Sequence, residues 1–478
     1  MLTRRNLIAA GLAGTSLGAF AQFRVEISGV GATQVPIAIP RFRDEDKAAQ
    51  QISQLSSERR VAKLVRECHR LLSVRAEANS PVIAQAIIGE IETLAESEYD
   101  ALFEALARQF SPEPDAVLNA AQAYAAGPSA ITLAALSAVA EPPRQELFRR
   151  LNRAPGGTAA LVRLRRRMLK RLREHSEWQS VEADLLHLLS SWFNPGFLEM
   201  RRVDWSSPAH LLEQIIRHEA VHAIDGWDDL RRRLQPDRRC FAFFHPQLAE
   251  TPLIFVEVAL VAAMPDAIAP LIDKNSPITS PKHFRVAAFY SISNCEPGLR
   301  GVSLGNFLIK RVAEALQAEL PQLKTFCTLS PIPGFMAWLS RGKAALVYDG
   351  LKPATLKRLN AALDILAKAT QSDFSRLANR DLVSGLDESA REALLALAGA
   401  YLIHESPRTQ GDPVARFHLD NGARLERLNA LADLSPKGLR QSAGLMVNYL
   451  YNLDRVEQSH EDFVNGTVTH ARAVSSLL

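Results

Sequence analysis

FRVAAFYSISNCEPGLRGVSLGNFLIKRVAEALQAELPQLKTFCTLSPIPGF, residues 284–335, is the stretch that decides the fold of the central part of this chain. Its apolar start at 284–293 predicts a strand that is covered on both faces. A glycine-bearing loop at 297–305 follows, then an amphipathic helix at 306–320 and a second strand at 323–329. Backbone N–H groups at the start of a helix carry partial positive charge and bind phosphate. The order strand, loop, helix, strand therefore predicts an α/β domain with a phosphate-binding loop before its helix.

The loop resembles the pyrophosphate loop of the GNAT acetyltransferase superfamily, whose pattern is R/Q-x-x-G-x-G/A. Arg300 and Gly305 match this pattern, and Ser303 stands where the middle glycine is usual. Longer stretches resemble the malonyl-CoA decarboxylase family, in that family's order: 289–293, 298–302, 307–312, 329–335, 414–423 and 444–449. The resemblance covers about residues 55–478. It implies an α+β multidomain protein, with an N-terminal all-α helical bundle followed by a GNAT-like α/β catalytic domain.

The resemblance also assigns roles to the residues that match the family's motifs. Ser330 and His418 match the catalytic pair, a proton acceptor and a proton donor, while Ser291 and Tyr451 match residues that line the acyl pocket. The coenzyme A loop corresponds to Arg300, Gly301, Val302, Ser303, Leu304, Gly305 and Asn306. Animal members of the family have glutamate where this chain has Ser303, so the role of that glutamate does not transfer.

The implied reaction is the conversion of malonyl-CoA to acetyl-CoA and carbon dioxide. Loss of the carboxylate leaves electrons on a carbon next to a thioester, and because the thioester is itself an electron sink, we expect neither a cofactor nor a metal. The protein has to stabilise the enolate and deliver a proton to carbon. Pro331 and Pro333 stiffen the turn after Ser330, and apolar neighbours favour a pKa of His418 near or below neutrality. The family resemblance further implies a homotetramer.

Composition limits the remaining possibilities. A chain of 478 residues is longer than one hydrophobic core usually supports, so two or more domains are expected. A net charge of +4 does not indicate a nucleic-acid partner. The four cysteines are scattered without a C-x-x-C pair, which argues against a zinc ribbon or a disulfide scaffold. Apart from an interrupted apolar run at the N-terminus, no stretch predicts a membrane span.

The first 54 residues do not share the pattern of the rest. Residues 1–21 have the features of an export signal, with Arg4 and Arg5 before an apolar run, and they also resemble a twin-arginine signal. Residues 22–54 resemble the mature start of the periplasmic protein TolB, and we expect a poorly ordered appendage there. Because coenzyme A enzymes work in the cytoplasm, we expect a cytoplasmic protein with a foreign N-terminal segment. Export is the alternative if that segment is native.

Residues 55–187 predict an all-helical oligomerisation domain, and residues 188–478 the GNAT-like catalytic domain. Apolar residues at helical spacing predict helices at 61–75, 83–108, 115–126, 132–140 and 158–173. The last of these is rich in arginine. Its alternation with apolar residues favours a solvated or interdomain face over a surface for nucleic acid.

Two other functions are compatible with parts of the sequence. His218 to His222 form a literal H-E-x-x-H zinc-protease motif, with both histidines expected on one face of a helix that ends near Asp225-Gly226. Catalytic zinc needs a third protein ligand, and Asp225 stands where metzincins have glycine, so we expect no metal. The main alternative is a GNAT-type acyl-CoA acyltransferase, because a fold does not fix the reaction.

Overall fold

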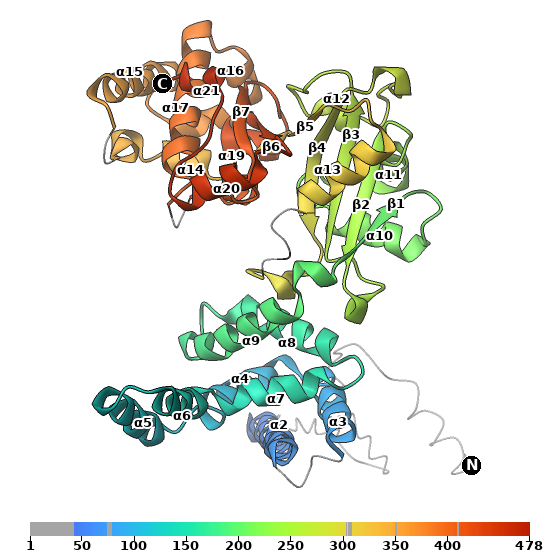
Figure 1. The fold of residues 1–478 in the computed structure, drawn as a ribbon, viewed down its shortest axis with the longest axis vertical. Coiled ribbons are helices and arrows are strands. Elements are labelled where there is room, and N and C mark those ends of the chain that lie inside the picture. The colour runs from blue at the N-terminus through green and yellow to red at the C-terminus, as the bar shows by residue number, and fades with distance from the viewer. Residues whose placement is uncertain (1–42, 74–78, 303, 305–307, 349–350, 409–410) are drawn as a thin grey trace, which may run out of the picture. The chain divides into compact units, whose positions relative to one another are not determined.

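The computed structural model describes residues 43–73, 79–302, 304, 308–348, 351–408 and 411–478 (Figure 1). The chain divides into a unit of residues 1–57 and a unit of residues 58–478. The signal-like segment at 1–21 and most of the TolB-like segment at 22–54 lie outside the described residues. Among the residues that are described, no helix combines the length and apolarity needed to cross a bilayer.

The N-terminal part of the second unit is helical, as predicted, and its first helix, α2, begins in the first unit at Arg43. The helices are α2 (Arg43–Leu72), α3 (Ser80–Glu92), α4 (Glu96–Gln109), α5 (Pro114–Ala126), α6 (Ala130–Ala140), α7 (Pro143–Asn152), α8 (Gly157–Arg171) and α9 (Gln179–Trp192). Proline in the first turn of α3, α5 and α7 suits a position whose N–H has no helical partner. The single helix predicted at 83–108 is wrong: the Ala95 N–H donates to Glu98 Oε2 over 2.7 Å, and a new helix begins at Glu96.

Several arginines of helix α8 form ion pairs with neighbouring helices. Its apolar side, which includes Leu161, Leu164 and Met168, is buried in the helical core. Three of its arginines form ion pairs with acidic residues of α3 and α4: Arg163–Glu92, Arg167–Glu96 and Arg171–Asp100. Helix α8 therefore packs through its apolar side, while these three arginines pair within the helical region and stay partly exposed, in agreement with the solvated face that is one of the two alternatives its sequence favours.

One mixed sheet organises the remainder. Its strands are β1 (Glu199–Val203), β2 (Arg238–Phe244), β3 (Ile254–Val261), β4 (Val286–Asn294), β5 (Thr325–Thr328), β6 (Ser330–Pro331), β7 (Arg424–Asn429) and β8 (Met446–Tyr451). They follow the order β1-β2-β3-β4-β5-β8-β6, with β7 paired to β8 (Figure 1). Every pairing is antiparallel except β4 with β5. An antiparallel meander followed by one parallel pair is the GNAT-like arrangement that was predicted.

In its described residues, the stretch at 284–335 forms the strands and the helix that its sequence indicates. Strand β4 is almost entirely buried, helix α13 (Leu308–Glu319) buries Leu308, Ile309 and Val312, and β5 returns parallel to β4. A parallel pair requires a crossover connection, and α13 supplies it. The fold class is therefore as predicted, a helical region followed by a GNAT-like α/β region.

Short and long helices complete the α/β region. They are α10 (Ala209–His218), α11 (Gly226–Arg233), α12 (Ala269–Ile272), α14 (Phe335–Leu339), α15 (Pro353–Thr370), α16 (Arg380–Ser384), α17 (Glu388–His404), α18 (Pro413–Asp420), α19 (Pro436–Ser442), α20 (Val456–Val464) and α21 (Arg472–Ser475). Side chains from α13 to α18 and from most strands share one large apolar core. Helix α18, which carries His418, is anchored in this core through Ala415 and Leu419.

Candidate active site

The candidate site lies where the two parallel strands part. Strands β4 and β5 are paired from Val286–Thr325 to Phe289–Thr328, after which the chain of β5 turns into β6 and pairs with β8 instead. Strand β4 has a bulge at Tyr290, since Phe289 pairs with Val258 while Ser291 pairs with Glu257. An extra residue in one strand bends it and re-aims the side chains that follow. The parting strands and the bulge open a cavity of about 270 Å³.

The cavity is mainly apolar, with a few polar groups at defined places. Its lining includes Ser291 of β4, Ser330 of β6 and His418 of α18. The remaining lining residues come from β3, β4, β6, α18 and the turn after α10: Val221, Ile254, Phe289, Tyr290, Ile292, Asn294, Pro331, Pro413, Val414 and Phe417. None of these lining residues carries a positive charge. A carboxylate that enters this cavity would therefore lose water without gaining an ion pair from the wall.

Ser330 and His418, which are 88 residues apart in the sequence, lie in hydrogen-bond contact. Ser330 Oγ is 3.0 Å from His418 Nε2, and the other ring nitrogen, Nδ1, is 2.9 Å from the hydroxyl oxygen of Tyr451. The imidazole also stacks on the ring of Tyr449, with ring centres 4.7 Å apart. The structure thus brings together three of the residues that the sequence singled out. Tyr451 lies behind His418, where it can act on the imidazole.

The hydrogen-bond partners select one tautomer of His418. Ser330 Oγ donates its proton to Thr328 Oγ1 over 2.8 Å, so it accepts from the imidazole, and Nε2 carries the hydrogen. In a neutral ring Nδ1 then accepts from Tyr451, whose phenol keeps its proton because burial raises its pKa well above the usual value. Burial lowers the pKa of His418 to about 3, so the ring is neutral near pH 7. The chain of donors runs from Tyr451 through His418 to Ser330.

Asp412 fixes helix α18 relative to the turn that follows Ser330. Its Oδ1 caps the helix by accepting from the N–H groups of Val414 and Ala415, each over 3.0 Å. Its Oδ2 accepts from the Gly334 N–H at 3.0 Å and from the Tyr401 hydroxyl at 3.2 Å. One buried carboxylate therefore holds the start of the helix that carries His418 and the end of the turn that begins at Ser330.

Ser291 is held by a second buried carboxylate. Its hydroxyl donates to Glu219 Oε2 over 2.6 Å, and Ser293 Oγ donates to the same oxygen over 3.2 Å. The other oxygen, Glu219 Oε1, accepts from the N–H groups of Val221 and His222, each over 2.8 Å. Glu219 therefore joins strand β4 to the turn that places Val221 in the cavity wall.

This role of Glu219 corrects the expected geometry of the H-E-x-x-H sequence. Helix α10 ends at His218 and Glu219 has a ψ of 107°, so the two histidines do not share a helical face, and the helix does not continue to Asp225. His222 is buried, and burial lowers its pKa to about 4. In the part of the chain that the structure describes, no group of three or more His, Cys, Asp or Glu side chains is arranged to hold a metal ion.

Part of the predicted coenzyme A loop is described. The 3₁₀ helix η6 (Pro297–Leu299) leads into Arg300, which is exposed, and into Gly301, whose φ of +83° favours glycine. Val302 and Leu304 are buried in the core. Ser303, Gly305 and Asn306, the other predicted members of the loop, lie outside the described residues.

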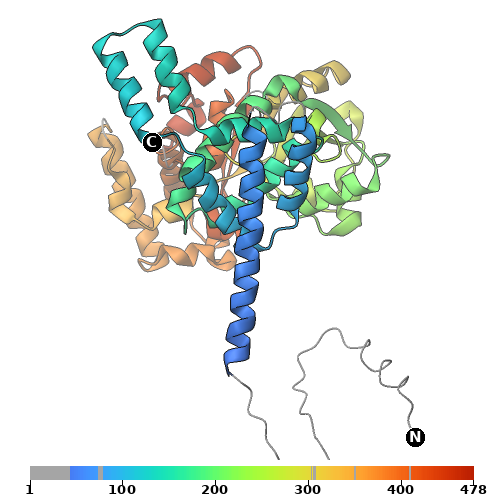
Figure 2. The same cartoon turned by 90° about the horizontal axis from the view of Figure 1, so that it is seen from below.

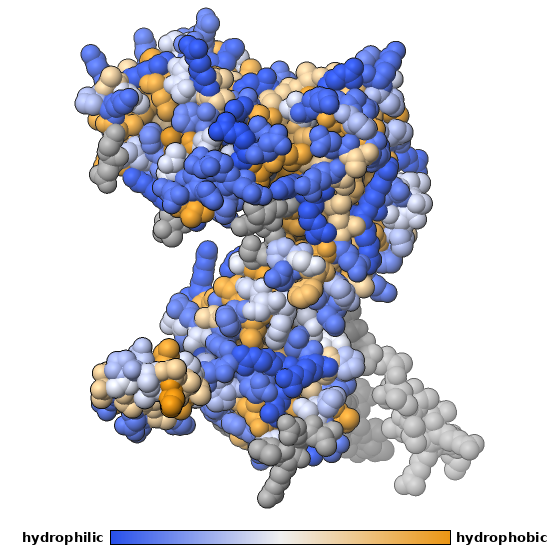
Figure 3. Space-filling model, viewed as in Figure 1, coloured by the Kyte–Doolittle hydropathy of each residue, from blue (hydrophilic) through white to orange (hydrophobic). Residues whose placement is uncertain are grey.

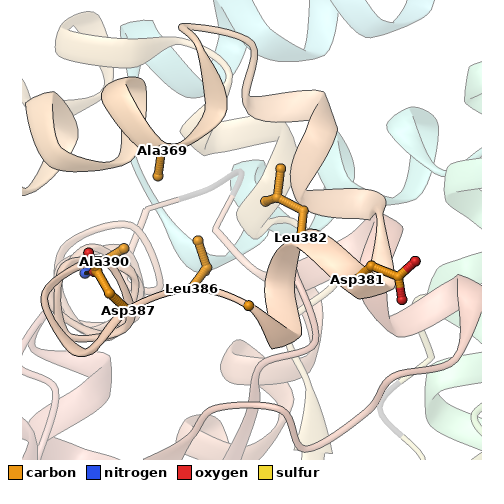
Figure 4. A pocket seen from close by; sticks show the side chains of 7 residues that line it. Ala369, Asp381, Leu382, Leu386, Asp387 and Ala390 are labelled. Atoms are coloured by element: carbon orange, nitrogen blue, oxygen red, sulfur yellow. Dashed lines mark hydrogen bonds between the residues drawn. The ribbon is translucent and has the colours of Figure 1, made fainter.

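A larger hollow of about 360 Å³ lies among α15, α16 and α17 (Figure 4). Its two acidic residues are Asp381 and Asp387, and its other lining residues are apolar or glycine. Asp387 Oδ1 already accepts from the Ala390 N–H over 2.8 Å and caps α17. None of the lining residues is a histidine, serine or cysteine. The hydroxyl and imidazole that lie in hydrogen-bond contact are in the smaller cavity.

Three residues of the site were missed by the sequence analysis. Thr328 accepts from Ser330, Asp412 positions α18, and Glu219 holds Ser291. The pair Asp412-Pro413 carries a readable signal, since an aspartate before a proline marks a helix start. Glu219 was noticed only as part of the zinc motif, and nothing in the sequence near Thr328 indicates its contact with Ser330.

Together, the fold and the cavity define a GNAT-like protein in which a hydroxyl and a neutral imidazole face an apolar pocket between parting strands. Residues 110–193 match the family model of the malonyl-CoA decarboxylase N-terminal domain, and residues 196–478 match that of the malonyl-CoA decarboxylase C-terminal domain. The chain belongs to the malonyl-CoA decarboxylase family, as its sequence motifs predicted.

Individual relatives agree with this assignment. Mitochondrial malonyl-CoA decarboxylase of Mus musculus is 38% identical over 320 residues, which are 64% of this chain and 65% of the mouse enzyme. The crystal structure of malonyl-CoA decarboxylase from Rhodopseudomonas palustris shares 46% identity with a TM-score of 0.76, over 87% of this chain and 99% of that one. A further stretch of 50 residues, 10% of this chain, is 58% identical to 11% of the Tol-Pal system protein TolB of Polaromonas naphthalenivorans. This last match is consistent with the resemblance seen at residues 22–54.

Proposed function

We propose that this protein converts malonyl-CoA to acetyl-CoA and carbon dioxide without a cofactor, through a thioester enolate. Membership in the malonyl-CoA decarboxylase family supports the substrate. The observation that carries the reaction is the chain from Tyr451 through His418 to Ser330, which ends at the wall of an apolar cavity. Ser330 and His418 are the proposed catalytic residues, and Ser291 and Tyr451 support them.

The cavity suits loss of a carboxylate. A malonyl carboxylate held among Val221, Ile254 and Val414 is stripped of water and meets no cation in the wall. Leaving as neutral carbon dioxide moves the negative charge from the unsolvated carboxylate to the enolate, where a hydrogen-bond donor can meet it, and this favours decarboxylation. The electrons of the broken C–C bond pass into the thioester to form the enolate, and a hydroxyl such as that of Ser330 can hydrogen-bond the enolate oxygen or donate to carbon.

The proton that the enolate carbon receives is supplied by His418 through Ser330. Ser330 turns its hydroxyl from Thr328 to the substrate and gives its proton to the enolate carbon. His418 restores that proton from Nε2, while Nδ1 takes the hydrogen of the Tyr451 hydroxyl. After product leaves, a proton from water in the cavity returns to Nε2 through Ser330, and Nδ1 gives its hydrogen back to Tyr451. One proton is consumed per turnover, the imidazole stays neutral, and the starting tautomer is restored.

The same geometry argues against a serine acyl-enzyme. In a Ser-His-Asp triad a buried carboxylate stabilises the imidazolium that forms when histidine takes the serine proton. In this protein the group behind His418 is the neutral phenol of Tyr451, and burial lowers the pKa of His418 to about 3. Such an imidazole is a poor general base but keeps a hydrogen on Nε2 to donate.

The decisive experiment is turnover of malonyl-CoA with no acceptor present. Release of carbon dioxide together with stoichiometric acetyl-CoA is expected. A GNAT-type acyltransferase, the alternative function, would leave malonyl-CoA intact until an amine acceptor is added. Intact malonyl-CoA after incubation with folded protein would therefore contradict the proposal.

The same proposal assigns a function to the catalytic domain and to the coenzyme A loop, and a location to the protein. Residues 188–478 act as the catalytic domain, and Arg300 to Asn306 bind the pyrophosphate of coenzyme A. We infer a cytoplasmic location, because the substrate is a coenzyme A thioester. Cell fractionation with sequencing of the mature N-terminus tests this, and a processed protein in the periplasm would favour export instead.

Residues 55–187 act as the oligomerisation domain, and the feature that supports this is the hairpin of α5 and α6 (Figures 1 and 2). Neither helix has a buried residue, although both are rich in alanine and leucine. Leu118, Ile131 and Leu133 are exposed by 56%, 82% and 47%, and apolar side chains are visible on the hairpin (Figure 3). We propose that copies of the chain cover this surface in a homotetramer, as the family resemblance implies.

Light scattering tests the oligomer. Ile131→Glu is expected to lower the mass of the particle, whereas Val464→Glu, at a residue of α20 exposed by 66%, is the matched control and is expected to leave it unchanged. A monomeric wild-type chain would contradict the proposal.

A further inference from the structure

One buried arginine of the helical region contacts the coenzyme A loop. Arg165 of α8 is only 1% exposed. Its Nη1 donates to the Gly298 carbonyl oxygen over 2.6 Å, and its Nη2 donates to the Arg300 carbonyl oxygen over 2.7 Å. Nη2 also contacts Glu182 Oε1 of α9 at 2.6 Å, so the guanidinium is itself held in place. The loop is thus fixed by a side chain that lies more than 130 residues earlier in the sequence.

The contact depends on close approach of the two backbones. A Cβ at Gly298 would lie 2.3 Å from the carbonyl oxygen of Val162, so only glycine allows the loop to lie against α8 at this point. A Cβ at Gly301 would lie 4.0 Å from Arg165 Nη2, which places the positive charge beside the loop as well. Arginine suits this position because its planar group carries several donors in a fixed fork, whereas lysine has a single nitrogen.

The hydrogen bond from Arg165 to the Arg300 carbonyl oxygen also fixes the direction of the next N–H group, that of Gly301. In a trans peptide the C=O of one residue and the N–H of the next point in opposite directions. Because the Arg300 carbonyl faces the Arg165 guanidinium, the Gly301 N–H faces away from α8. The positive φ of Gly301, +83°, then turns the chain toward Val302 and Leu304. The N–H groups of Arg300 and Val302 already donate to the carbonyls of Pro297 and Leu299, so among these three the Gly301 N–H is the one directed toward an anion.

We propose that Arg165 is a positioning residue for coenzyme A, which orients the Arg300–Gly301 peptide so that its N–H can bind the pyrophosphate. This inference rests on the proposed function, since it assumes a coenzyme A thioester as substrate. Arg165 does not touch the substrate. It acts through the loop, and its effect is confined to the part of the substrate that carries phosphate.

The test compares two substrates that share the reacting group. Malonyl-CoA carries the pyrophosphate, and the malonyl thioester of N-acetylcysteamine does not. Arg165→Met removes the hydrogen bonds to both carbonyls and is expected to raise KM for malonyl-CoA and Kd for coenzyme A about 10- to 100-fold, the loss typical of one charge-assisted hydrogen bond. Its kcat for malonyl-CoA and its kcat/KM for the short thioester should stay within about twofold of wild type.

Arg167→Met is the matched control, because Arg167 lies on the same helix and pairs with Glu96, away from the loop. It should leave all of these constants unchanged. Arg165→Lys, which keeps the charge but not the fork, is expected to fall between wild type and Arg165→Met. Gly298→Ala disturbs the same contact from the loop side and should reproduce the pattern if Arg165→Met does not fold.

The outcomes distinguish the role of Arg165 from the proposed function. Equal losses for both substrates in Arg165→Met or Gly298→Ala, or unchanged Kd for coenzyme A in a folded variant, would overturn the role of Arg165. Because Kd is measured by calorimetry with coenzyme A alone, it does not depend on turnover. Tight coenzyme A binding without decarboxylation in the wild-type protein would instead reject the proposed function.

Discussion

Replacing His418 with alanine tests the proposed proton donor most directly. The change removes the contacts of Nε2 with Ser330 at 3.0 Å and of Nδ1 with Tyr451 at 2.9 Å. General acid catalysis is typically worth about 10²- to 10⁴-fold, and we expect kcat to fall within that range. Kd for coenzyme A should stay within about twofold of wild type, because the described part of the loop is held by Arg165 rather than by α18.

The variant is expected to fold. Ser330 keeps its hydrogen bond to Thr328, so the main loss is the partner of the buried Tyr451 hydroxyl. Leaving one buried polar group unsatisfied costs about 1–3 kcal/mol. That is a fraction of the ~5–15 kcal/mol by which a folded protein is usually stable. Urea unfolding of both proteins measures this cost and shows whether lost turnover reflects lost structure.

A double-mutant cycle tests whether the groups act as one relay. Ser330→Ala should lower kcat as strongly as His418→Ala, and the double variant should be no slower than either single variant. Tyr451→Phe removes both the hydrogen bond that selects the tautomer and the hydrogen that Nδ1 takes up, so its kcat is also expected to fall by about 10²- to 10⁴-fold. Steady-state release of carbon dioxide from malonyl-CoA measures all four proteins. Near-normal kcat in folded His418→Ala would show that the proton has another source, and the proposed mechanism would be wrong.

Three further predictions concern pH, metal and the N-terminus. Because burial lowers the pKa of His418 to about 3, the ring stays neutral as the pH falls from 8 to 5. The pH profile of kcat/KM should therefore show no inflection near the ordinary histidine pKa of about 6.5. An inflection near 6.5 in the wild type that is absent from His418→Gln would contradict the neutral ring. Chelators should not inhibit turnover, and His218→Ala should retain it, since Glu219 is already bound to backbone N–H groups; stoichiometric zinc in the purified protein would argue otherwise. Deleting residues 1–53 should leave turnover intact, because Val61 is the first buried residue of α2 among the side chains described. Precipitation of the shortened chain would show that residues 1–53 are needed for folding.

Local pattern predicted the strand-loop-helix-strand stretch well, because each of its elements has its own signal. Strand β4 is a continuous apolar run, and α13 has apolar residues at helical spacing. The same pattern failed at 83–108, where apolar periodicity continues through a break. That break depends on one side chain, Glu98, which reaches back to the Ala95 N–H. Capping contacts of this kind decide boundaries that periodicity does not register.

The contacts between the site residues could not be predicted from sequence, for a different reason. Family resemblance pointed to Ser330, His418, Ser291 and Tyr451, but their relation depends on strand pairing. Tyr451 reaches His418 because β8 pairs with both β5 and β6, an order that no local signal in the sequence indicates. The helix predicted to carry both histidines of H-E-x-x-H and to end near Asp225 was wrong for a similar reason, since Glu219 ends the helix itself. A motif gives residue types and spacing, while the backbone conformation decides which of them meet.

The contact of Arg165 with Gly298 and Arg300 also bears on how this chain can be divided. By its sequence, the region from residue 188 onward looks like a self-contained module that could be expressed or transplanted alone. Cut there, the fragment would keep the two loop carbonyls but lose the guanidinium that satisfies them, while Arg165 of the helical fragment would keep Glu182 but lose both carbonyl acceptors. Each half would carry unsatisfied hydrogen-bonding groups at the cut surface. Boundaries for truncated or chimeric proteins are therefore better drawn outside residues 157–302, so that α8 and the loop remain in one piece.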